Sequence, residues 1–408
     1  MVASPPPAAR ARRPRLVAGD ALTLAIAWWV GFNLRAVLLA VPPVLARVRA
    51  DLGLSYTAAG LLTALPVLVF GLAALPGAAL VRRLGGHRTV GLGLLVLAAG
   101  TPLRVAGGPV GLYGGTLLLA AGIAVAQPGL PVLLRARFPA AVQRASVLVT
   151  CGLISGELVA ASVTAPLLAP LTGGGWRGGF LAWTLPAALA AAGWALVEPD
   201  RPAPPASGDR ASAVRRSARV WWASAIFAAQ SLAYFATNTW LPTAVAGGPD
   251  SREATLGLAV LNTVQLPVTL ALVGTRRPFV RSRGFYVAAG ALVAVGTAGW
   301  LAAADAAVPL WAALVGTGVS MTFAALLAYP PTVEASEDVA PFTALMLTVG
   351  YCVAFTGPFL GGVALDLLHW RRAPFLPIAV AAGVMLLCGL RPPSPRRRGA
   401  PARHQSEP

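Results

Sequence analysis

The sequence has few charged residues, three histidines and three cysteines. Of its 408 residues, 11% are charged, which is too few to cover a protein of this size in water. Cys151, Cys352 and Cys388 all fall inside apolar stretches, and none has the C-x-x-C spacing. Neither a soluble globular fold nor a disulfide or zinc framework is therefore expected.

Several functional motifs are also missing. The sequence has no G-x-x-x-x-G-K-[ST] string, which excludes an ATP-binding subunit on this chain. His87, His369 and His404 are scattered, and no His, Asp or Glu cluster has metal-ligand or acid-base spacing. We find no selectivity-filter signature and no ring of pore-lining charges, so a channel is not favoured. We predict no catalytic residue, no metal and no cofactor.

Long apolar stretches dominate what is present. Apolar side chains make up 57% of the chain, and its mean hydropathy is +0.71. The stretches recur with short interruptions, and each is long enough to cross about 30 Å of hydrocarbon. We predict an all-α membrane protein with twelve transmembrane helices in two six-helix pseudo-repeats. The predicted spans are 20–46, 56–81, 88–106, 109–133, 142–171, 178–197, 219–246, 254–274, 284–303, 307–330, 338–367 and 371–390.

One internal segment, 198–218, divides the two sets of six spans. It is rich in Pro, Ser, Asp and Arg, a composition that neither packs nor inserts, and we interpret it as a linker. The first apolar run continues past the arginines before it without a clear signal-peptide cleavage site, so we expect a retained first helix. The predicted parts are a disordered basic tail at 1–19, a bundle at 20–197, the linker at 198–218, a bundle at 219–390 and a disordered basic tail at 391–408.

The net charge of +18 comes from arginines in the short segments between spans and at the two ends. That placement favours anionic lipid headgroups rather than nucleic acid as the partner. Arginine-rich segments alternate with segments that carry fewer, such as those of Arg104, Arg177 and Arg252, which predicts an inner-membrane protein with both termini in the cytoplasm. The segment 331–341 breaks the alternation with acids, which count weakly in this rule. The arginine-rich segments are 82–88, 135–144, 201–219, 276–283 and 391–403.

The fifth and eleventh spans carry similar features in the same order. The two sets are Pro166 followed by Trp176 and Arg177, and Pro358 followed by Trp370 and Arg371. We interpret this as a weak internal repeat of the two halves. Alternatively, Pro and Trp-Arg merely mark helix ends at the membrane interface.

Arg35 is the main intramembrane charge, because it lies in the middle of the first predicted span. A guanidinium stays protonated there, so it must face a polar cavity or a partner. Its planar fork suits a carboxylate, a cyanate-like anion or a polar heterocycle. We predict that Arg35, with Asn33 beside it, binds the solute. The alternatives are a structural ion pair and a side chain that extends to the interface.

Glu157 is the second buried charge and lies near the middle of the fifth span. It is a candidate to bind Arg35 or to take up a proton. Burial and a neighbouring arginine act in opposite directions on its protonation, so solute at Arg35 would change it. We predict a proton-coupling role for Glu157, with a permanent salt bridge between the first and fifth helices as the alternative.

A third polar set lies in the second half of the chain. Gln230, Tyr234 and Asn238 are four residues apart and share one helix face. We predict that they line the second half of a central cavity, whereas hydrogen bonds between helices are the alternative. The full predicted set is Gln230, Tyr234, Asn238, Trp240 and Tyr351 as solute-binding residues, with Asn262 and Gln265 in the eighth span.

This arrangement resembles the major facilitator superfamily, because two sets of six spans flank a linker and an arginine-rich turn joins spans two and three. Several strings narrow the resemblance to the branch of cyanate and 2-nitroimidazole transporters, over nearly the whole chain except the tails and linker. The resemblance implies the fold and alternating access. The strings are Asn33-Leu34-Arg35, Asp51-Leu52-Gly53-Leu54-Ser55, Ala59-Gly60-Leu61-Leu62-Thr63-Ala64-Leu65-Pro66-Val67-Leu68, Gln230-Ser231, Trp240-Leu241-Pro242, Val349-Gly350-Tyr351, Gly357-Pro358 and Asp366.

The superfamily's turn motif, ordinarily G-x-L-A-D-R-x-G-R-K, corresponds to residues 78–87 here. The resemblance implies a conformational role for Arg82, Arg83 and Gly85. Arg82 stands at the acid position and Gly86 at the second arginine position. This departure puts in question the superfamily's charge relay between the turn and its neighbours, although this branch commonly has Arg-Arg there.

Together these features predict a monomeric secondary transporter rather than an enzyme. We expect it to move a small anionic or polar solute by alternating access, with a proton as the candidate coupling ion in symport or antiport. A first alternative is a broad-specificity drug efflux pump whose site uses aromatic and apolar contacts. A second alternative is a membrane sensor that does not transport.

Overall fold

The structure is a computed structural model. It describes residues 18–139, 141–173, 175–199, 215, 217–274, 279–302, 307–333 and 339–391. Most of both predicted tails and most of the predicted linker 198–218 lie outside the described residues.

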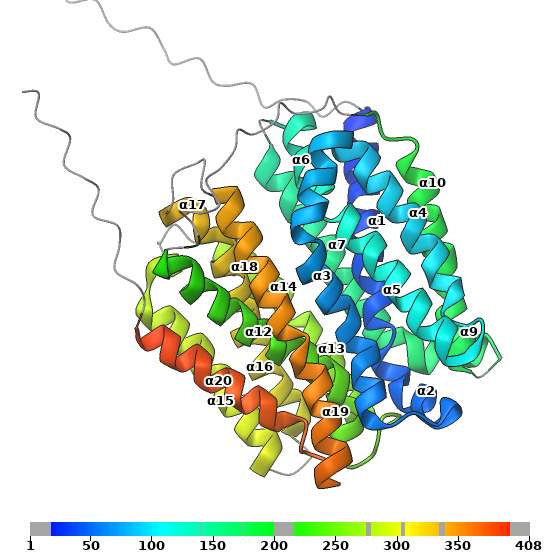
Figure 1. Cartoon of the computed structure of the whole chain (residues 1–408), viewed down its shortest axis with the longest axis vertical. Helices are drawn as coiled ribbons and strands as arrows, with labels where there is room; N and C mark the ends of the chain where they lie inside the picture. Colours follow the sequence, from blue (N-terminus) through cyan, green and yellow to red (C-terminus); the bar gives the residue numbers. More distant parts are fainter. Residues whose placement is uncertain are drawn as a thin grey trace, which may run out of the picture.

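All regular secondary structure in the described residues is helical, which confirms the predicted all-α class. The helices form two groups that stand side by side (Figure 1), and we call them the first half (α1 to α10) and the second half (α12 to α20). The first half contains α1 (Ala18–Leu39), η1 (Pro42–Val44), α2 (Leu45–Leu52), α3 (Tyr56–Leu84), α4 (Gly86–Leu103), α5 (Gly108–Ala126), α6 (Gly129–Arg137), α7 (Val142–Val163), η2 (Thr164–Leu168), α8 (Ala169–Leu171), α9 (Trp176–Ala182) and α10 (Thr184–Trp194).

The second half has the same general pattern of long helices and shorter segments. By length and hydropathy, eight helical stretches in the described part of the chain are long and apolar enough to cross a membrane. The second half contains α12 (Ala218–Ala244), α13 (Arg252–Thr263), α14 (Gln265–Gly274), η3 (Phe279–Arg281), α15 (Arg283–Ala302), α16 (Val308–Ala328), α17 (Pro330–Val333), α18 (Val339–Ala354), α19 (Thr356–Leu368) and α20 (Phe375–Leu390).

Helix packing repeats between the halves. Helix α1 packs on α7 as α12 packs on α18, and α4 packs on α5 as α15 packs on α16. Helix α10 packs on α4 as α20 packs on α15. Between the halves, α3 contacts α18 and α19, and α7 contacts α13. These five helices therefore form the seam where the halves meet.

Proline interrupts one seam helix from each half, as predicted. Pro166 has no N–H to continue the ladder of α7, and the chain widens there to a π-helix in which the Ala169 N–H reaches the carbonyl of Thr164. Pro358 lies at the third position of α19, directly after α18 ends at Ala354. Both interruptions fall in helices that contact the opposite half.

Glycine sets how closely α1 and α7 approach. Gly152 and Gly156, spaced four apart on α7, face the backbone carbonyls of Trp28 and Phe32 on α1 with no room for a side chain. Gly31 on α1 faces the carbonyl of Val149 in the same way. Small residues at this spacing let two membrane helices pack backbone against backbone.

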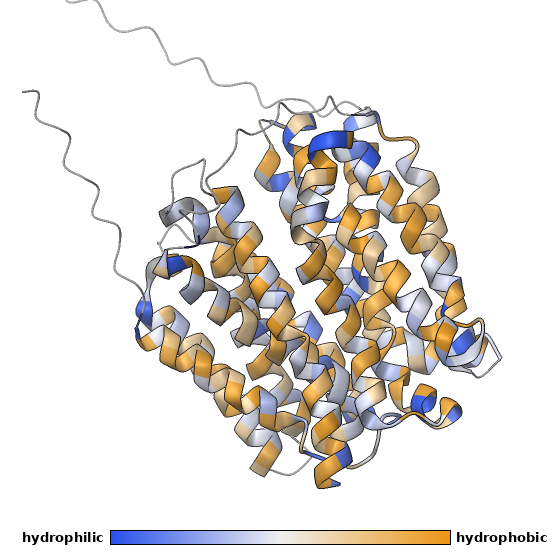
Figure 2. Ribbon diagram, viewed as in Figure 1, coloured by the Kyte–Doolittle hydropathy of each residue, from blue (hydrophilic) through white to orange (hydrophobic). Residues whose placement is uncertain are grey.

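The outer surfaces of both halves are apolar. Large side chains such as Val110, Leu171, Leu367 and Val380 are exposed. Figure 2 shows hydrophobic residues along the helices and hydrophilic residues gathered mainly near the ends. In water such a surface would be unfavourable, but it suits lipid, where the helical backbone already satisfies its own polar groups.

The α1–α7 crossing gives a testable prediction. A valine at Gly156 would press against the carbonyl of Phe32 and force α1 and α7 apart. We expect Gly156→Val to cost about 1–3 kcal/mol and to lower the melting temperature in detergent. Gly193→Val is the matched control, because a side chain there would meet no neighbouring atom. Equal melting temperatures for the two variants would contradict the tight crossing.

Candidate functional site

A buried ion pair lies at the α1–α7 crossing. The Arg35 Nε and the Glu157 Oε1 are 3.5 Å apart, and the side chains are 8% and 7% exposed. Glu157 directly follows Gly156, so the close helix approach brings the two charges together. The Arg35 Nη1 is buried without a hydrogen-bond partner. One nitrogen of the guanidinium is thus left without the partner that buried donors usually have.

Two tyrosines of the second half face this pair. Tyr351 on α18 interacts with the guanidinium of Arg35, and Tyr234 on α12 interacts with the carboxylate of Glu157. Four residues that the sequence analysis singled out separately therefore meet at one place. The group includes both halves of the molecule, so relative movement of the halves would change it.

Hydrogen bonds between α12 and α13 hold Tyr234. Its hydroxyl donates to the Asn262 Oδ1 over 2.9 Å, and the Asn262 Nδ2 donates to the Asn238 Oδ1 over 2.9 Å. The Gln265 Nε2 donates to the same Asn262 Oδ1 over 3.4 Å. The interhelical alternative from the sequence is thus present, and the network orients the Tyr234 hydroxyl.

The remaining predicted solute-binding residues are placed differently. Asn33 is fully buried, and its Oδ1 has no hydrogen-bond partner. The Gln230 Nε2 donates to the Ser231 Oγ over 2.5 Å. The Trp240 Nε1 donates to the Pro358 carbonyl over 2.9 Å, so this indole belongs to the α12–α19 packing rather than to the group around Arg35.

Polar contacts join the two halves at one end of the molecule, which we call the closed end. There the Asp366 carboxylate of α19 accepts from the backbone N–H groups of Tyr56 and Thr57 at 3.0 and 2.7 Å. It also accepts from the Thr57 hydroxyl at 2.6 Å. A carboxylate at the N-terminus of α3 satisfies free N–H groups and complements the helix dipole. Asp366 had appeared only within the family-like strings, and its role depends on a contact between halves.

Two further links lie towards the same end. The Thr239 hydroxyl of α12 donates to the Thr63 hydroxyl of α3 over 3.0 Å. The Arg47 Nη2 and the Asp250 Oδ1 are 2.6 Å apart, with side chains 36% and 59% exposed. An ion pair that exposed contributes little, so the Asp366 contacts dominate.

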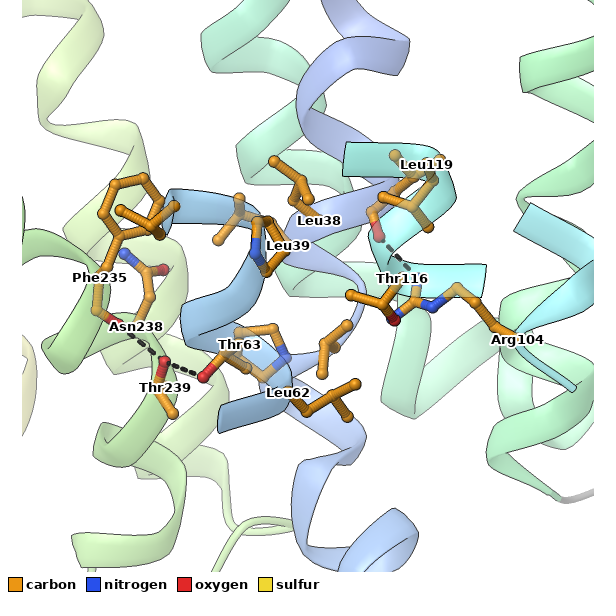
Figure 3. Close-up of a pocket in the computed structure, with 15 residues that line it drawn as sticks. Leu38, Leu39, Leu62, Thr63, Arg104, Thr116, Leu119, Phe235, Asn238 and Thr239 are labelled. Carbon is orange, nitrogen blue, oxygen red and sulfur yellow. Dashed lines mark hydrogen bonds between the residues drawn. The ribbon is translucent and has the colours of Figure 1, made fainter. Parts of the chain in front are cut away.

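A small cavity lies between Arg35 and the closed end. Its volume is about 30 Å³, and its walls come from α1, α3, α5 and α12 (Figure 3). Of the predicted solute-binding residues Asn238 lines it, while Arg35 is not among its lining residues. The polar lining is Thr63, Arg104, Thr116, Asn238 and Thr239.

Arg104 corrects the sequence interpretation, which placed it in a short loop facing the exterior. It follows the end of α4, and its side chain is 1% exposed. The Nη1 donates to the Val37 carbonyl over 2.9 Å, and the guanidinium carbon lies 4.1 Å from the centre of the Phe180 ring. Its position inside the predicted span 88–106 was the signal that could have identified it.

The turn motif lies at the opposite end from the closed end. Helix α3 ends at Leu84 and α4 begins at Gly86, so Gly85 alone turns the chain, with a φ of 82° that favours glycine. Arg82 and Arg83 are exposed, and the ion pairs among the described residues do not include them. Within the described ranges, no group of three His, Cys, Asp or Glu residues is placed to hold a metal ion.

The sequence comparisons agree with this architecture. A family profile described as Major Facilitator Superfamily matches residues 23–330. The chain is 28% identical to the uncharacterized transporter YycB of Bacillus subtilis, covering 88% of this chain and 90% of that protein. It is 28% identical to the 2-nitroimidazole transporter of Escherichia coli, covering 88% and 92%. It is 26% identical to the cyanate transport protein CynX of Escherichia coli, covering 82% and 87%.

A solved structure shares the fold. It is a bacterial homolog of the human lysosomal transporter Spinster, in an inward-facing and unoccupied conformation. The TM-score is 0.72 at 14% identity, and the match covers 91% of this chain and 97% of that one. This likeness confirms the predicted helical membrane fold.

The contacts of Asp366 give a prediction about the closed end. We expect Asp366→Ala to loosen this end, because charge-assisted hydrogen bonds contribute about 1.5–3 kcal/mol. The measurement is labelling of Thr63→Cys by a membrane-impermeant maleimide after the native cysteines are replaced by alanine. Labelling should accelerate roughly tenfold, since a shift of 1.4 kcal/mol is tenfold in population.

The control for this experiment is Asp250→Ala, which removes an exposed ion pair at the same end. It should change labelling much less, because exposed pairs contribute at most about 1 kcal/mol. Equal acceleration by both variants, or none by Asp366→Ala, would contradict the dominance of the Asp366 contacts.

Proposed function

Because the chain belongs to the Major Facilitator Superfamily, we propose that this secondary transporter carries a small anionic or polar solute across the cytoplasmic membrane. The solute is a cyanate-like anion or a nitroimidazole-like heterocycle, in keeping with the names of two relatives. The observation that carries the proposal is the Arg35 guanidinium, which is buried between the halves with a free donor at Nη1.

The proposed mechanism is alternating access around Arg35. Arg35 and Glu157 belong to the first half, whereas Tyr234 and Tyr351 approach them from the second. A solute bound between these groups would contact both halves at once. Binding would then favour closure around it, and release would follow separation of the halves at one end at a time.

We propose that Glu157 couples this cycle to protons. An anion at the guanidinium would compete with Glu157 for its partner. A buried carboxylate that loses its partner is costly, and protonation removes that cost. Anion binding therefore favours proton binding, so the two travel in the same direction.

Orientation and surroundings follow from the arginines. We propose that the end opposite the closed end faces the cytoplasm, because the arginine-rich segments around 82–88 and 135–144 lie there. These arginines would contact anionic lipid headgroups. Both termini would be cytoplasmic, and the chain would act as a monomer.

One observation favours a second function, a broad-specificity efflux pump. Tyr351 is surrounded by the rings of Phe70, Phe227 and Phe235, with centroids at 5.9, 5.1 and 6.5 Å. Such rings suit flat or lipophilic solutes. Competition between small anions and lipophilic cations separates the two functions, since an anion carrier would be inhibited by the anions alone.

Arg35 gives the direct test of the proposed site. We expect Arg35→Ala to lower cyanate or 2-nitroimidazole transport in proteoliposomes by roughly tenfold to a hundredfold, because hydrogen bonds to a charged group contribute about 1.5–3 kcal/mol. Arg35→Lys should fall between, since it keeps the charge but loses the planar fork. Size-exclusion profiles verify folding. Full transport by folded Arg35→Ala protein would refute the site.

Glu157 gives the test of coupling. Glu157→Gln cannot exchange a proton, so its transport rate should lose the pH dependence of the unmodified protein. Initial rates between about pH 5 and pH 8, with and without an imposed proton gradient, measure this. If the glutamine variant keeps the same pH profile and still responds to the gradient, Glu157 is not the coupling group.

A further inference from the structure

We infer that Arg104 forms a second anion-binding site, between Arg35 and the closed end, which the solute occupies before or after it reaches Arg35. This inference rests on the proposed function, because it places the site on the path of the same solute. The ligand class is a small monovalent anion.

The charge of Arg104 has no counter-charge among the residues that the structure describes. Its side chain is 1% exposed, and no carboxylate among the described residues forms an ion pair with it. The Phe180 ring, 4.1 Å away, offsets only part of the charge. An uncompensated buried charge is strongly unfavourable, so an anion from solution would stabilise this arrangement.

The two nitrogens of Arg104 that lack hydrogen-bond partners lie on the edge of the guanidinium that can hold an anion. Its Nε and Nη2 are both buried without hydrogen-bond partners. These two nitrogens carry parallel N–H groups on one edge of the guanidinium, the geometry that holds an anion with two hydrogen bonds. A purely structural arginine would be expected to use this edge on backbone carbonyls or a carboxylate.

A hydrogen bond from Arg104 to the backbone of α1 positions that edge. Near the end of α1 the Val41 N–H donates to the carbonyl of Leu38, three residues back, instead of to the carbonyl of Val37, four residues back. The Val37 carbonyl therefore lacks this helical partner. The Arg104 Nη1 donates a hydrogen bond to this carbonyl over 2.9 Å. The guanidinium is thereby fixed while its Nε and Nη2 remain without hydrogen-bond partners.

The adjoining cavity sets the size of the ligand. A volume of about 30 Å³ has room for about two water molecules. A halide or a cyanate ion is of this size, whereas a nitroimidazole is larger. The cavity is also lined by the Asn238 amide, one N–H of which donates to the Tyr234 carbonyl over 3.1 Å, while the hydroxyls of Thr63 and Thr116 donate to backbone carbonyls of their own helices (Figure 3).

Polar side chains connect this cavity to the central pair. Asn238 lines the cavity and accepts from Asn262, which accepts in turn from Tyr234. Tyr234 interacts with Glu157, the partner of Arg35. An anion that leaves Arg104 would therefore meet polar groups on the way to Arg35.

Bromide tests the site in the full-length purified protein, because it is small, monovalent and visible by anomalous scattering. Crystals grown in bromide should show an anomalous peak beside the Nε and Nη2 of Arg104. Replacing gluconate with bromide should raise the melting temperature by about 2–4 °C. Arg104→Met should lose this rise, while Arg252→Met, which removes an exposed arginine, should keep it.

A transport assay then links the site to the solute. Arg104→Met should raise the KM for cyanate supplied at the closed end roughly tenfold and leave the KM from the other end within about twofold. If Arg104→Met loses the bromide effect on melting temperature but keeps the KM for cyanate, the anion at Arg104 is a permanently bound structural ion and not the transported solute. That result would overturn the inference.

Absence of the anomalous peak in unmodified protein would also overturn it, whether or not Arg104→Met folds. Failure of the proposed function is a separate result. In that case unmodified protein moves no cyanate or 2-nitroimidazole from either end, although bromide still binds beside Arg104.

Discussion

The central constraint on this protein is the cost of holding a charge inside a helix bundle that is apolar on its outside. Arg35 meets this constraint through Glu157, and the two can approach because Gly152 and Gly156 let α1 and α7 pack backbone against backbone. Compensation is incomplete, since the Arg35 Nη1 has no partner. That remaining donor is the basis for proposing that the pair binds a ligand and does more than stabilise the fold.

The same constraint acts at the closed end. The first N–H groups of α3 lack partners within their own helix, and Asp366 from the other half satisfies two of them. Separation of the halves at this end would break those bonds, so the helix start must find water or another acceptor there. In a transporter that opens to one side at a time, water can replace Asp366 as the acceptor when this end opens. The contacts that close the end can therefore break at little cost.

Arg104 shows the constraint in its strongest form among the described residues. The guanidinium has one hydrogen bond and one aromatic ring but no carboxylate. Together with Arg35 it places two cations near the end of α1, and a small cavity adjoins Arg104. A solute that carries negative charge would be attracted to both arginines, and its size would decide whether it fits the cavity beside Arg104.

Much of the architecture was predictable from sequence. The helical class, the positions of the spans and the breaks at Pro166 and Pro358 follow from hydrocarbon thickness and from the missing N–H of proline. The ion pair of Arg35 and Glu157 was among the arrangements predicted, since a charge in an apolar span requires a partner. Trp240 was grouped with the site because of its position on the helix, but its indole N–H donates to a backbone carbonyl of α19.

The sequence by itself therefore determined which segments are apolar enough to cross a membrane and which residues within them are too polar to face lipid, because both depend on local composition. Only the tertiary structure decided which partner each polar residue has. The contacts of Asp366 with α3, of Arg104 with α1 and of Tyr351 with Arg35 join residues far apart in the chain, and they depend on how closely the helices pack. No local pattern encodes that geometry, which comes from small residues at helix crossings and from the way the two halves meet.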